Sequence, residues 1–192
     1  EIGVRLVGSE MCIRDRVDKM IILAIESSCD DTSVAILNNT QLLSNVVSSQ
    51  IAFHNKYGGV MPELASRLHV EKITYVIKEA LEIAKIRLEE IDYIAFTQGP
   101  GLIGSLHVGM QAAKTLSLLL NKPLIPIHHL AGHIYANRFV KDFKYPLLAL
   151  VVSGGHTEFV YMEKELSFKV IGSTLDLSLI HISEPTRRTP IS

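Results

Sequence analysis

Short apolar runs alternate with long helix-like stripes in this chain, and that order most constrains its fold. Residues 20–26 (MIILAIE) form a continuous apolar run, which is typical of a strand covered on both faces. We expect two more strands at 32–37 and 42–47, because the two asparagines at 38–39 mark a turn between them. The chain therefore opens with a predicted meander of three strands.

The alternation continues through the rest of the core. Residues 62–88 predict a long helix, because Pro62 suits a first helical turn and apolar residues recur at helical spacing. The remaining predicted elements are strands at 91–97 and 123–127, a helix at 105–120, a helix after the second of these strands, and strands at 147–152, 157–162 and 168–171. The order βββαβαβα, followed by the start of a second meander, predicts an α/β fold.

Both ends of the chain break this pattern. Residues 1–16 (EIGVRLVGSEMCIRDR) and 177–192 (LSLIHISEPTRRTPIS) resemble translated sequencing-adapter read-through, with an ordinary tail as the alternative. A targeting peptide is disfavoured, because no apolar segment with a small-residue cleavage site follows a basic start. We expect the native sequence to begin near Met20 and to break off near Asp176, so that the chain is a fragment.

The charge balance argues against a free-standing nucleic-acid-binding domain. The chain has 19 Lys and Arg against 20 Asp and Glu. Leaving out 1–16 (three basic, three acidic) and 177–192 (two basic, one acidic) gives 14 against 16. A nucleic-acid-binding domain usually carries a clear basic excess. We therefore expect any RNA partner to be held by a local patch or by a separate subunit.

Cysteine content and hydropathy indicate a cytoplasmic protein without a membrane partner. Of the two cysteines, Cys12 lies in the suspect N-terminal flank, which leaves Cys29 alone. One thiol cannot form an internal disulfide, which suits a reducing compartment. The apolar runs have the length of strands and do not reach membrane-spanning length.

Three loops carry candidate chemistry, each with a structural alternative. Residues 26–33 (ESSCDDTS) offer hydroxyls, carboxylates and amides that suit phosphate oxygens or a divalent ion, or form a polar hairpin turn. Residues 98–104 (QGPGLIG) would admit an anion at a helix N-terminus or allow tight strand–helix packing; they match neither a dinucleotide fingerprint nor a P-loop. Residues 153–157 (SGGHT) would cradle a ligand, form a hairpin turn, or do both.

His129 and His133 form a candidate metal pair. Histidines four apart on a helix lie on one face, and the apolar run at 123–127 places them near the C-terminal end of a strand, where ligands gather in α/β proteins. Hydrogen-bonded or partly exposed histidines are the alternative. Leu130 stands where the zinc-protease motif has glutamate, which disfavours a metalloprotease. A metal needs at least one further ligand, and none is obvious.

Five segments, in this order, resemble one family: IESSCDDTSVAI, YGGVMPELASRLHV, TQGPGLIGSLHVG, PIHHLAGH and LVVSGGHT. The family is the bacterial-type tRNA N6-adenosine threonylcarbamoyltransferase (TsaD/Gcp), and the resemblance covers about 20–176. It implies the actin-like ATPase (ASKHA, ribonuclease H-like) fold, in which two related α/β lobes close over a nucleotide. The first lobe would occupy 17–140, and 141–176 would begin the second.

The resemblance also implies an activity and a set of site residues. The family transfers a threonylcarbamoyl group from threonylcarbamoyl-AMP to N6 of the adenosine 3′ of the anticodon, in tRNAs that read codons beginning with A. It implies one divalent metal, iron (Fe2+) or alternatively zinc, on His129 and His133. The implied substrate-binding residues are Val151, Val152, Ser153, Gly154 and Gly155. The implied ligand loop, which would face the same cleft, comprises Ser27, Ser28, Cys29, Asp30 and Asp31.

The implied partners are tRNA, threonylcarbamoyl-AMP, a paralogous TsaB-like scaffold subunit and a small TsaE-like ATPase, all in the cytoplasm. The family's third metal ligand is an aspartate in a C-terminal half that this chain lacks, so we expect the chain as written to bind metal weakly and to be inactive. Two alternatives stay open. One is a non-catalytic scaffold paralogue of the same fold, and the other is a small-molecule kinase of the same superfamily.

Overall fold

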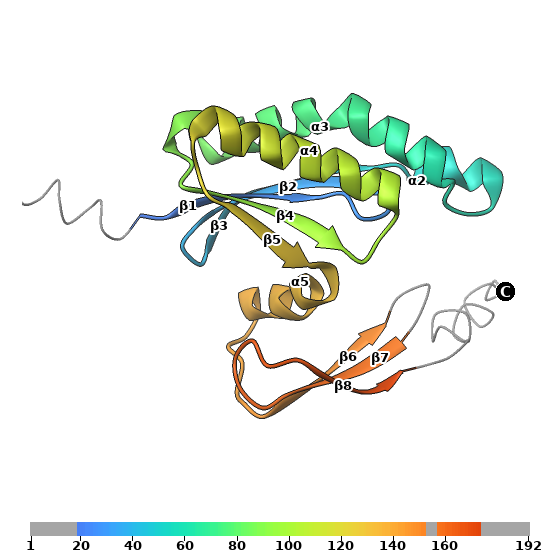
Figure 1. Ribbon diagram of the computed structural model, residues 1–192, viewed down its shortest axis with the longest axis vertical. Helices are drawn as coiled ribbons and strands as arrows, with labels where there is room; N and C mark the ends of the chain where they lie inside the picture. Colours follow the sequence, from blue (N-terminus) through green and yellow to red (C-terminus); the bar gives the residue numbers. More distant parts are fainter. Residues whose placement is uncertain (1–18, 153–156, 174–192) are drawn as a thin grey trace, which may run out of the picture. The chain divides into compact units, whose positions relative to one another are not determined.

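A five-stranded mixed sheet forms the core of the N-terminal part of the molecule (Figure 1). The computed structural model describes residues 19–152 and 157–173. The five strands are β1 (Ile21–Glu26), β2 (Asp31–Asn38), β3 (Gln41–Ser49), β4 (Tyr93–Gly99) and β5 (Leu124–His128). Their order in the sheet is β3-β2-β1-β4-β5, so that β1 lies at the centre.

The opening meander is antiparallel, and the later strands extend it in parallel. Leu23 on β1 is paired with Ile36 on β2 and, on its other side, with Ile94 on β4. β5 then pairs in parallel with β4. Because β1, β4 and β5 run in the same direction, their C-terminal ends share one edge of the sheet.

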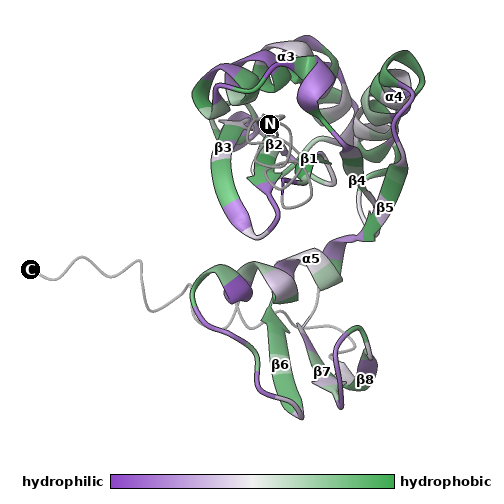
Figure 2. Ribbon diagram, turned by 90° about the vertical axis from the view of Figure 1, so that its left-hand side faces the viewer, coloured by the Kyte–Doolittle hydropathy of each residue, from purple (hydrophilic) through white to green (hydrophobic). Residues whose placement is uncertain are grey.

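Two helices cover one face of this sheet, as Figures 1 and 2 both show. Helix α3 (Pro62–Ala84) packs on β2 and β3, and helix α4 (Ile103–Leu120) packs on β4 and β1. In Figure 2, α3 alternates between hydrophilic and hydrophobic segments, as expected for a helix with one buried side. The core between the layers contains Ile21, Leu23, Ile25, Val34, Ile36, Ile73, Val76, Ile94 and Phe96.

Burial on the central strand is one-sided. Ile21, Leu23 and Ile25 are at most 2% exposed, whereas the alternate residues of β1 are partly exposed. Their alternation follows the two-residue period of a strand. The prediction that β1 is covered on both faces is therefore wrong for the residues that the structure describes, because both α3 and α4 pack on the same side.

Helix α3 ends earlier than its apolar stripe predicts. Its last helical residue is Ala84, because Lys85 adopts a left-handed conformation with φ 55°. The N–H of Ile86 then donates to the carbonyl of Leu81 at 3.1 Å, and the Ile86 side chain packs against the core. This closure is typical of a helix C-terminus that is stabilised by an apolar contact. The prediction that the helix extends to residue 88 is wrong.

Short helical turns connect the main elements. Helix α2 (Ile51–His54) and the 3-10 turn η1 (Asn55–Tyr57) follow β3, and the 3-10 turn η2 (Leu88–Glu90) precedes β4. Helix α4 begins at Ile103 rather than at residue 105. Turns of three or four residues are too short to show a helical period in the sequence.

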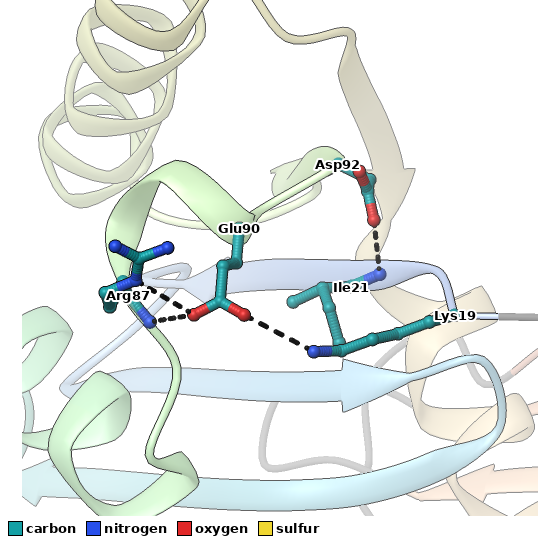
Figure 3. A network of polar contacts seen from close by, with 5 residues as sticks. All are labelled: Lys19, Ile21, Arg87, Glu90 and Asp92. Carbon is teal, nitrogen blue, oxygen red and sulfur yellow. Dashed lines mark hydrogen bonds and ion pairs between the residues drawn. The ribbon is translucent and has the colours of Figure 1, made fainter. Parts of the chain in front are cut away.

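A polar network ties the start of β1 to the segment before β4 (Figure 3). The N–H of Ile21 donates to Asp92 at 2.9 Å. Glu90 accepts the backbone N–H of Arg87 at 3.0 Å and lies 3.4 Å from the Lys19 ammonium. Exposed ion pairs of this kind contribute little stability, but the Asp92 carboxylate satisfies the backbone N–H at the start of β1.

The second compact unit begins at Leu130 and contains a three-stranded antiparallel sheet. Helix α5 (His129–Ala136) leads into the 3-10 turn η3 (Asn137–Phe139) and then into the meander. The strands are β6 (Leu147–Val152), β7 (Thr157–Met162) and β8 (Lys169–Ser173), in the order β6-β7-β8. The core of this unit contains Ile134, Val151, Val160 and Met162.

The predicted α/β element order is confirmed through β8. The compact units divide between His129 and Leu130, and the lobe limits of 17–140 and 141–176 stay predictions. Among the described residues, no helix is both long and apolar enough to cross a membrane.

Candidate functional site

Polar residues converge where the parallel strands β1, β4 and β5 end. Glu26 is the last residue of β1, Thr97 lies near the end of β4, and His129 directly follows β5. Nδ1 of His129 lies 3.2 Å from Oε2 of Glu26. The hydroxyl of Thr97 donates to the same carboxylate oxygen. The shared strand direction thus brings together residues that are far apart in the sequence.

Glu26 is held as an ionised acceptor. Its other oxygen, Oε1, accepts the backbone N–H of Ser28. Burial raises the pKa of the carboxyl, but hydrogen bonds from His129, Ser28 and Thr97 outweigh burial and lower the pKa to about 2. The carboxylate therefore accepts hydrogen bonds at neutral pH and has little tendency to take up a proton.

The loop after β1 is packed tightly beneath α4. Ser27 and Ser28 are buried, and the Ser27 hydroxyl donates to the carbonyl of Ser105 at 2.8 Å. The N–H of Leu102 donates to the carbonyl of Ser28 at 2.7 Å. A Cβ added at Gly101 would lie 2.5 Å from that same carbonyl oxygen. This close approach supports the packing interpretation of residues 98–104.

Cys29 and Asp30 complete the same loop, and Asp31 begins β2. The Cys29 thiol is free and exposed. Partial burial of its sulfur, followed by the hydrogen bond and charge of Asp30, raises the thiol pKa to about 11. The thiol is therefore protonated at neutral pH and is a poor nucleophile. In the part of the chain that the structure describes, the buried Oδ1 of Asp31 has no hydrogen-bond partner.

His69 holds the loop after β1 through hydrogen bonds. It was not among the site residues predicted from the sequence. It lies on α3 and is fully buried. Its Nε2 lies 3.0 Å from the Cys29 carbonyl, and its Nδ1 lies 2.7 Å from the Thr32 hydroxyl. A carbonyl can only accept, so the proton belongs on Nε2, and Nδ1 accepts from Thr32. The available signal was a histidine beside Leu68 on the otherwise apolar stripe of α3.

The predicted site residues are divided between the two compact units, and two of them are in contact within the first unit. His129 meets Ser28, whose Oγ lies 3.2 Å from Nδ1, and His133 follows one turn later on α5. Val151 is buried in the core of the second unit, and Val152 ends β6. The remaining predicted substrate residues, Ser153, Gly154 and Gly155, and also His156, lie outside the described residues.

The predicted metal pair has no third protein ligand in the described ranges. Within residues 19–152 and 157–173, no group of three or more His, Cys, Asp or Glu side chains could hold a metal ion. Oε2 of Glu26 contacts Nδ1 of His129, so the carboxylate supports the imidazole on the side away from Nε2. This arrangement is common for histidines that bind metal through the other nitrogen. Glu26 opens the candidate loop at 26–33, but its contact with His129 was not predicted from the sequence.

Known proteins match this chain over most of its length. The family model described as "TsaD: tRNA N6-adenosine threonylcarbamoyltransferase" matches residues 41–183. A protein of that name from Staphylococcus carnosus (strain TM300) is 55% identical over 170 residues, which are 88% of this chain and 50% of that protein. Another from Bacillus thuringiensis (strain Al Hakam) is 57% identical over 157 residues, which are 81% and 46%. The chain thus spans about half the length of these curated relatives.

Solved structures show the same fold at low sequence identity. YeaZ from Pseudomonas aeruginosa superposes with a TM-score of 0.52 at 18% identity, covering 80% of this chain and 67% of that one. A second structure, an uncharacterized protein with similarity to peptidase YEAZ from the same organism, gives 0.54 at 20% identity, covering 80% and 64%. With the family match over 41–183, these results show that the chain belongs to the tRNA N6-adenosine threonylcarbamoyltransferase (TsaD) family and has its actin-like ATPase fold.

Proposed function

We propose that the protein from which this chain derives transfers a threonylcarbamoyl group from threonylcarbamoyl-AMP to N6 of the adenosine 3′ of the anticodon, in tRNAs that read codons beginning with A. The observation that carries the proposal is 55% identity over 170 residues to a relative with that transferase name. The meeting of Glu26, Ser28 and His129 at the shared strand edge supports a ligand site in this half.

In the proposed reaction, the N6 amine attacks the carbamoyl carbonyl, the bond to AMP breaks, and the amine loses a proton. Glu26 is poorly suited to accept that proton, because three donors already contact its carboxylate and its pKa is lowered to about 2. Its role in the proposed site is to hold other groups in position. The net charge near zero also implies that tRNA would be held by a local basic patch or by a separate subunit.

His129 and His133 are our proposed metal ligands. Their donor chemistry fits a divalent ion, because two imidazoles lie one helical turn apart and a carboxylate supports one of them. Iron as Fe2+ is the proposed metal, with zinc as the alternative. A bound metal would polarise substrate oxygens or neutralise phosphate charge. Since the described residues contain no group of three possible ligands, a further ligand must come from elsewhere in the protein.

The proposed substrate contacts are the end of β6 and the loop after β1. Val151, Val152 and residues 153–155 are assigned to the threonylcarbamoyl-AMP site, and residues 27–31 to a ligand loop with a supporting role. We also propose a paralogous TsaB-like scaffold partner, a small TsaE-like ATPase, and a cytoplasmic location.

The test is reconstitution of the full-length protein. Its coding sequence would be read from the source locus over the whole reading frame. The purified protein would be combined with unmodified tRNA, the proposed partners and an enzyme that forms threonylcarbamoyl-AMP, and nucleosides would be measured by mass spectrometry. We expect threonylcarbamoyladenosine with the natural sequence and at least a tenfold loss with His129→Ala or His133→Ala, since metal ligation is critical for such sites.

The matched control is His107→Ala, because His107 is an exposed histidine on α4. This variant should modify tRNA at the natural rate. Absence of the modified nucleoside with every component present would refute the transferase proposal. A protein that stimulates a separate transferase, without binding metal itself, would be a scaffold paralogue. Phosphorylation of a small molecule with ATP would identify a kinase.

A further inference from the structure

We propose that Glu26 is a positioning residue that fixes the tautomer and ring orientation of His129. This inference deepens the proposed function, because it rests on His129 being a metal ligand. It starts from one contact: Nδ1 of His129 and Oε2 of Glu26 are 3.2 Å apart although the two residues are 103 positions apart in the sequence.

The chemistry of the contact assigns the ring proton. An ionised carboxylate can only accept hydrogen bonds, so the nitrogen that faces it carries the proton. The Ser28 hydroxyl also lies 3.2 Å from Nδ1, but a hydroxyl can rotate to donate or accept and so does not select a tautomer. His129 therefore has its proton on Nδ1 and its lone pair on Nε2, the nitrogen on the opposite side of the ring.

The carboxylate that makes this selection is itself held in place. The backbone N–H of Ser28 donates to Oε1, and the Thr97 hydroxyl donates to Oε2. Glu26 lies at the end of β1, the central strand of the sheet. Because donors from two different segments hold its two oxygens, the carboxylate cannot rotate away from His129 without losing one of these hydrogen bonds.

This geometry makes Glu26→Gln a sharp test. The Ser28 backbone N–H cannot reverse its role, so the amide oxygen of glutamine must stay on that side. The amide NH2 group then faces His129, and a donor facing Nδ1 requires Nδ1 to be the acceptor. We expect the proton to move to Nε2, whereas the Thr97 hydroxyl can rotate to accommodate the change. The substitution should therefore invert the tautomer while the shape of the side chain is preserved.

The primary measurement is the 15N chemical shift of both His129 ring nitrogens in the metal-free full-length protein. The natural sequence should show a protonated Nδ1, and Glu26→Gln should show a protonated Nε2. Two controls remove neighbouring contacts but keep the carboxylate: Thr97→Val and Ser28→Ala should both retain the natural tautomer. Circular dichroism would confirm that each variant is folded.

Several results would overturn the inference. One is a His129 ring that is protonated on Nε2 in the natural protein. This measurement does not depend on the folding of any variant. Another is inversion by Ser28→Ala with retention by Glu26→Gln, which would assign the role to the hydroxyl. A role confined to stability would leave the tautomer of every folded variant unchanged.

A zinc titration separates this inference from the proposed function. If His129 binds metal, Glu26→Gln should weaken Zn2+ binding to the full-length protein by about 10- to 100-fold, as is common when a supporting partner of a ligand is lost. Thr97→Val should change it by only a few-fold. A natural protein that shows the expected tautomer but does not bind Zn2+ would refute the metal assignment. Zn2+ binding with no effect of Glu26→Gln would refute the positioning role instead.

Discussion

The imidazole of His69 on α3 lies 2.7 Å from the hydroxyl of Thr32 on β2, with both residues fully buried. The opposite ring nitrogen lies 3.0 Å from the carbonyl of Cys29. One side chain thus links the helix layer, the sheet and the loop that approaches His129. Through these two contacts, His69 holds the loop of the candidate site in place.

Replacing His69 with leucine should lower the free energy of unfolding by about 2–4 kcal/mol, because buried polar partners lose their hydrogen bonds. Urea denaturation of this chain would measure the change. His107→Leu, at an exposed position on α4, should stay within about 0.5 kcal/mol. Adding Thr32→Val to His69→Leu should recover part of the loss, since it removes an unsatisfied hydroxyl. A cost below about 1 kcal/mol would show that these contacts contribute little.

Gly101 leaves no room for a side chain. A Cβ at this position would lie 2.5 Å from the Ser28 carbonyl oxygen and 3.0 Å from the Ser28 Cα, and backbone atoms cannot move aside cheaply. We expect Gly101→Ala to destabilise the protein by about 1–3 kcal/mol, the usual cost of overpacking. Gly59→Ala is the matched control, because a Cβ there would meet no atom within 4 Å.

Thermal and urea unfolding of the two glycine variants would be compared at one pH. The control should be as stable as the natural sequence or slightly more stable, because alanine restricts the unfolded chain. Equal stability of Gly101→Ala and Gly59→Ala would contradict the tight packing of α4 on the loop after β1.

The sequence predicted the elements whose pattern lies within a few neighbouring residues, and it did not predict features that depend on tertiary packing. The apolar run at 20–26 predicted β1, and turn residues separated the strands of the meander. The end of α3 was not predicted, because the apolar stripe continues past Ala84 while Ile86 turns back onto the core. The point at which α3 ends therefore depends on the packing of the Ile86 side chain against the core.

The candidate site shows the same limit. His129 was predicted from its spacing to His133 and its place after a strand. Its contact with Glu26, the first residue of the candidate loop at 26–33, was not predicted, because the two residues are 103 positions apart. A topological rule could have found it: parallel strands end at the same edge of a sheet, so the polar residue that ends β1 was a candidate neighbour.

Replacing Lys85 with glycine should stabilise the protein. Lys85 terminates α3 with φ 55°, a left-handed conformation that is costly for a residue with a Cβ. Lys85→Gly should raise the free energy of unfolding by about 0.5–1 kcal/mol, because glycine adopts this conformation without strain. Asn121 ends α4 with φ 50°, but asparagine tolerates this region well, so Asn121→Gly should gain less. A destabilised Lys85→Gly variant would show that its side chain makes a more important contact.

Cys29 should react with alkylating reagents only at high pH. Its thiol pKa is raised to about 11 by burial and by Asp30, so the reactive thiolate is scarce at neutral pH and grows about tenfold per pH unit below the pKa. A Cys12→Ser background leaves Cys29 as the only thiol. The iodoacetamide rate should still rise between pH 9 and 10, whereas an ordinary thiol with a pKa of about 8.5 would approach a plateau. Asp30→Asn should shift the profile to lower pH, because it removes the negative charge that disfavours the thiolate. A plateau at or below pH 9 in the Cys12→Ser protein, or no shift with Asp30→Asn, would contradict this account of the loop.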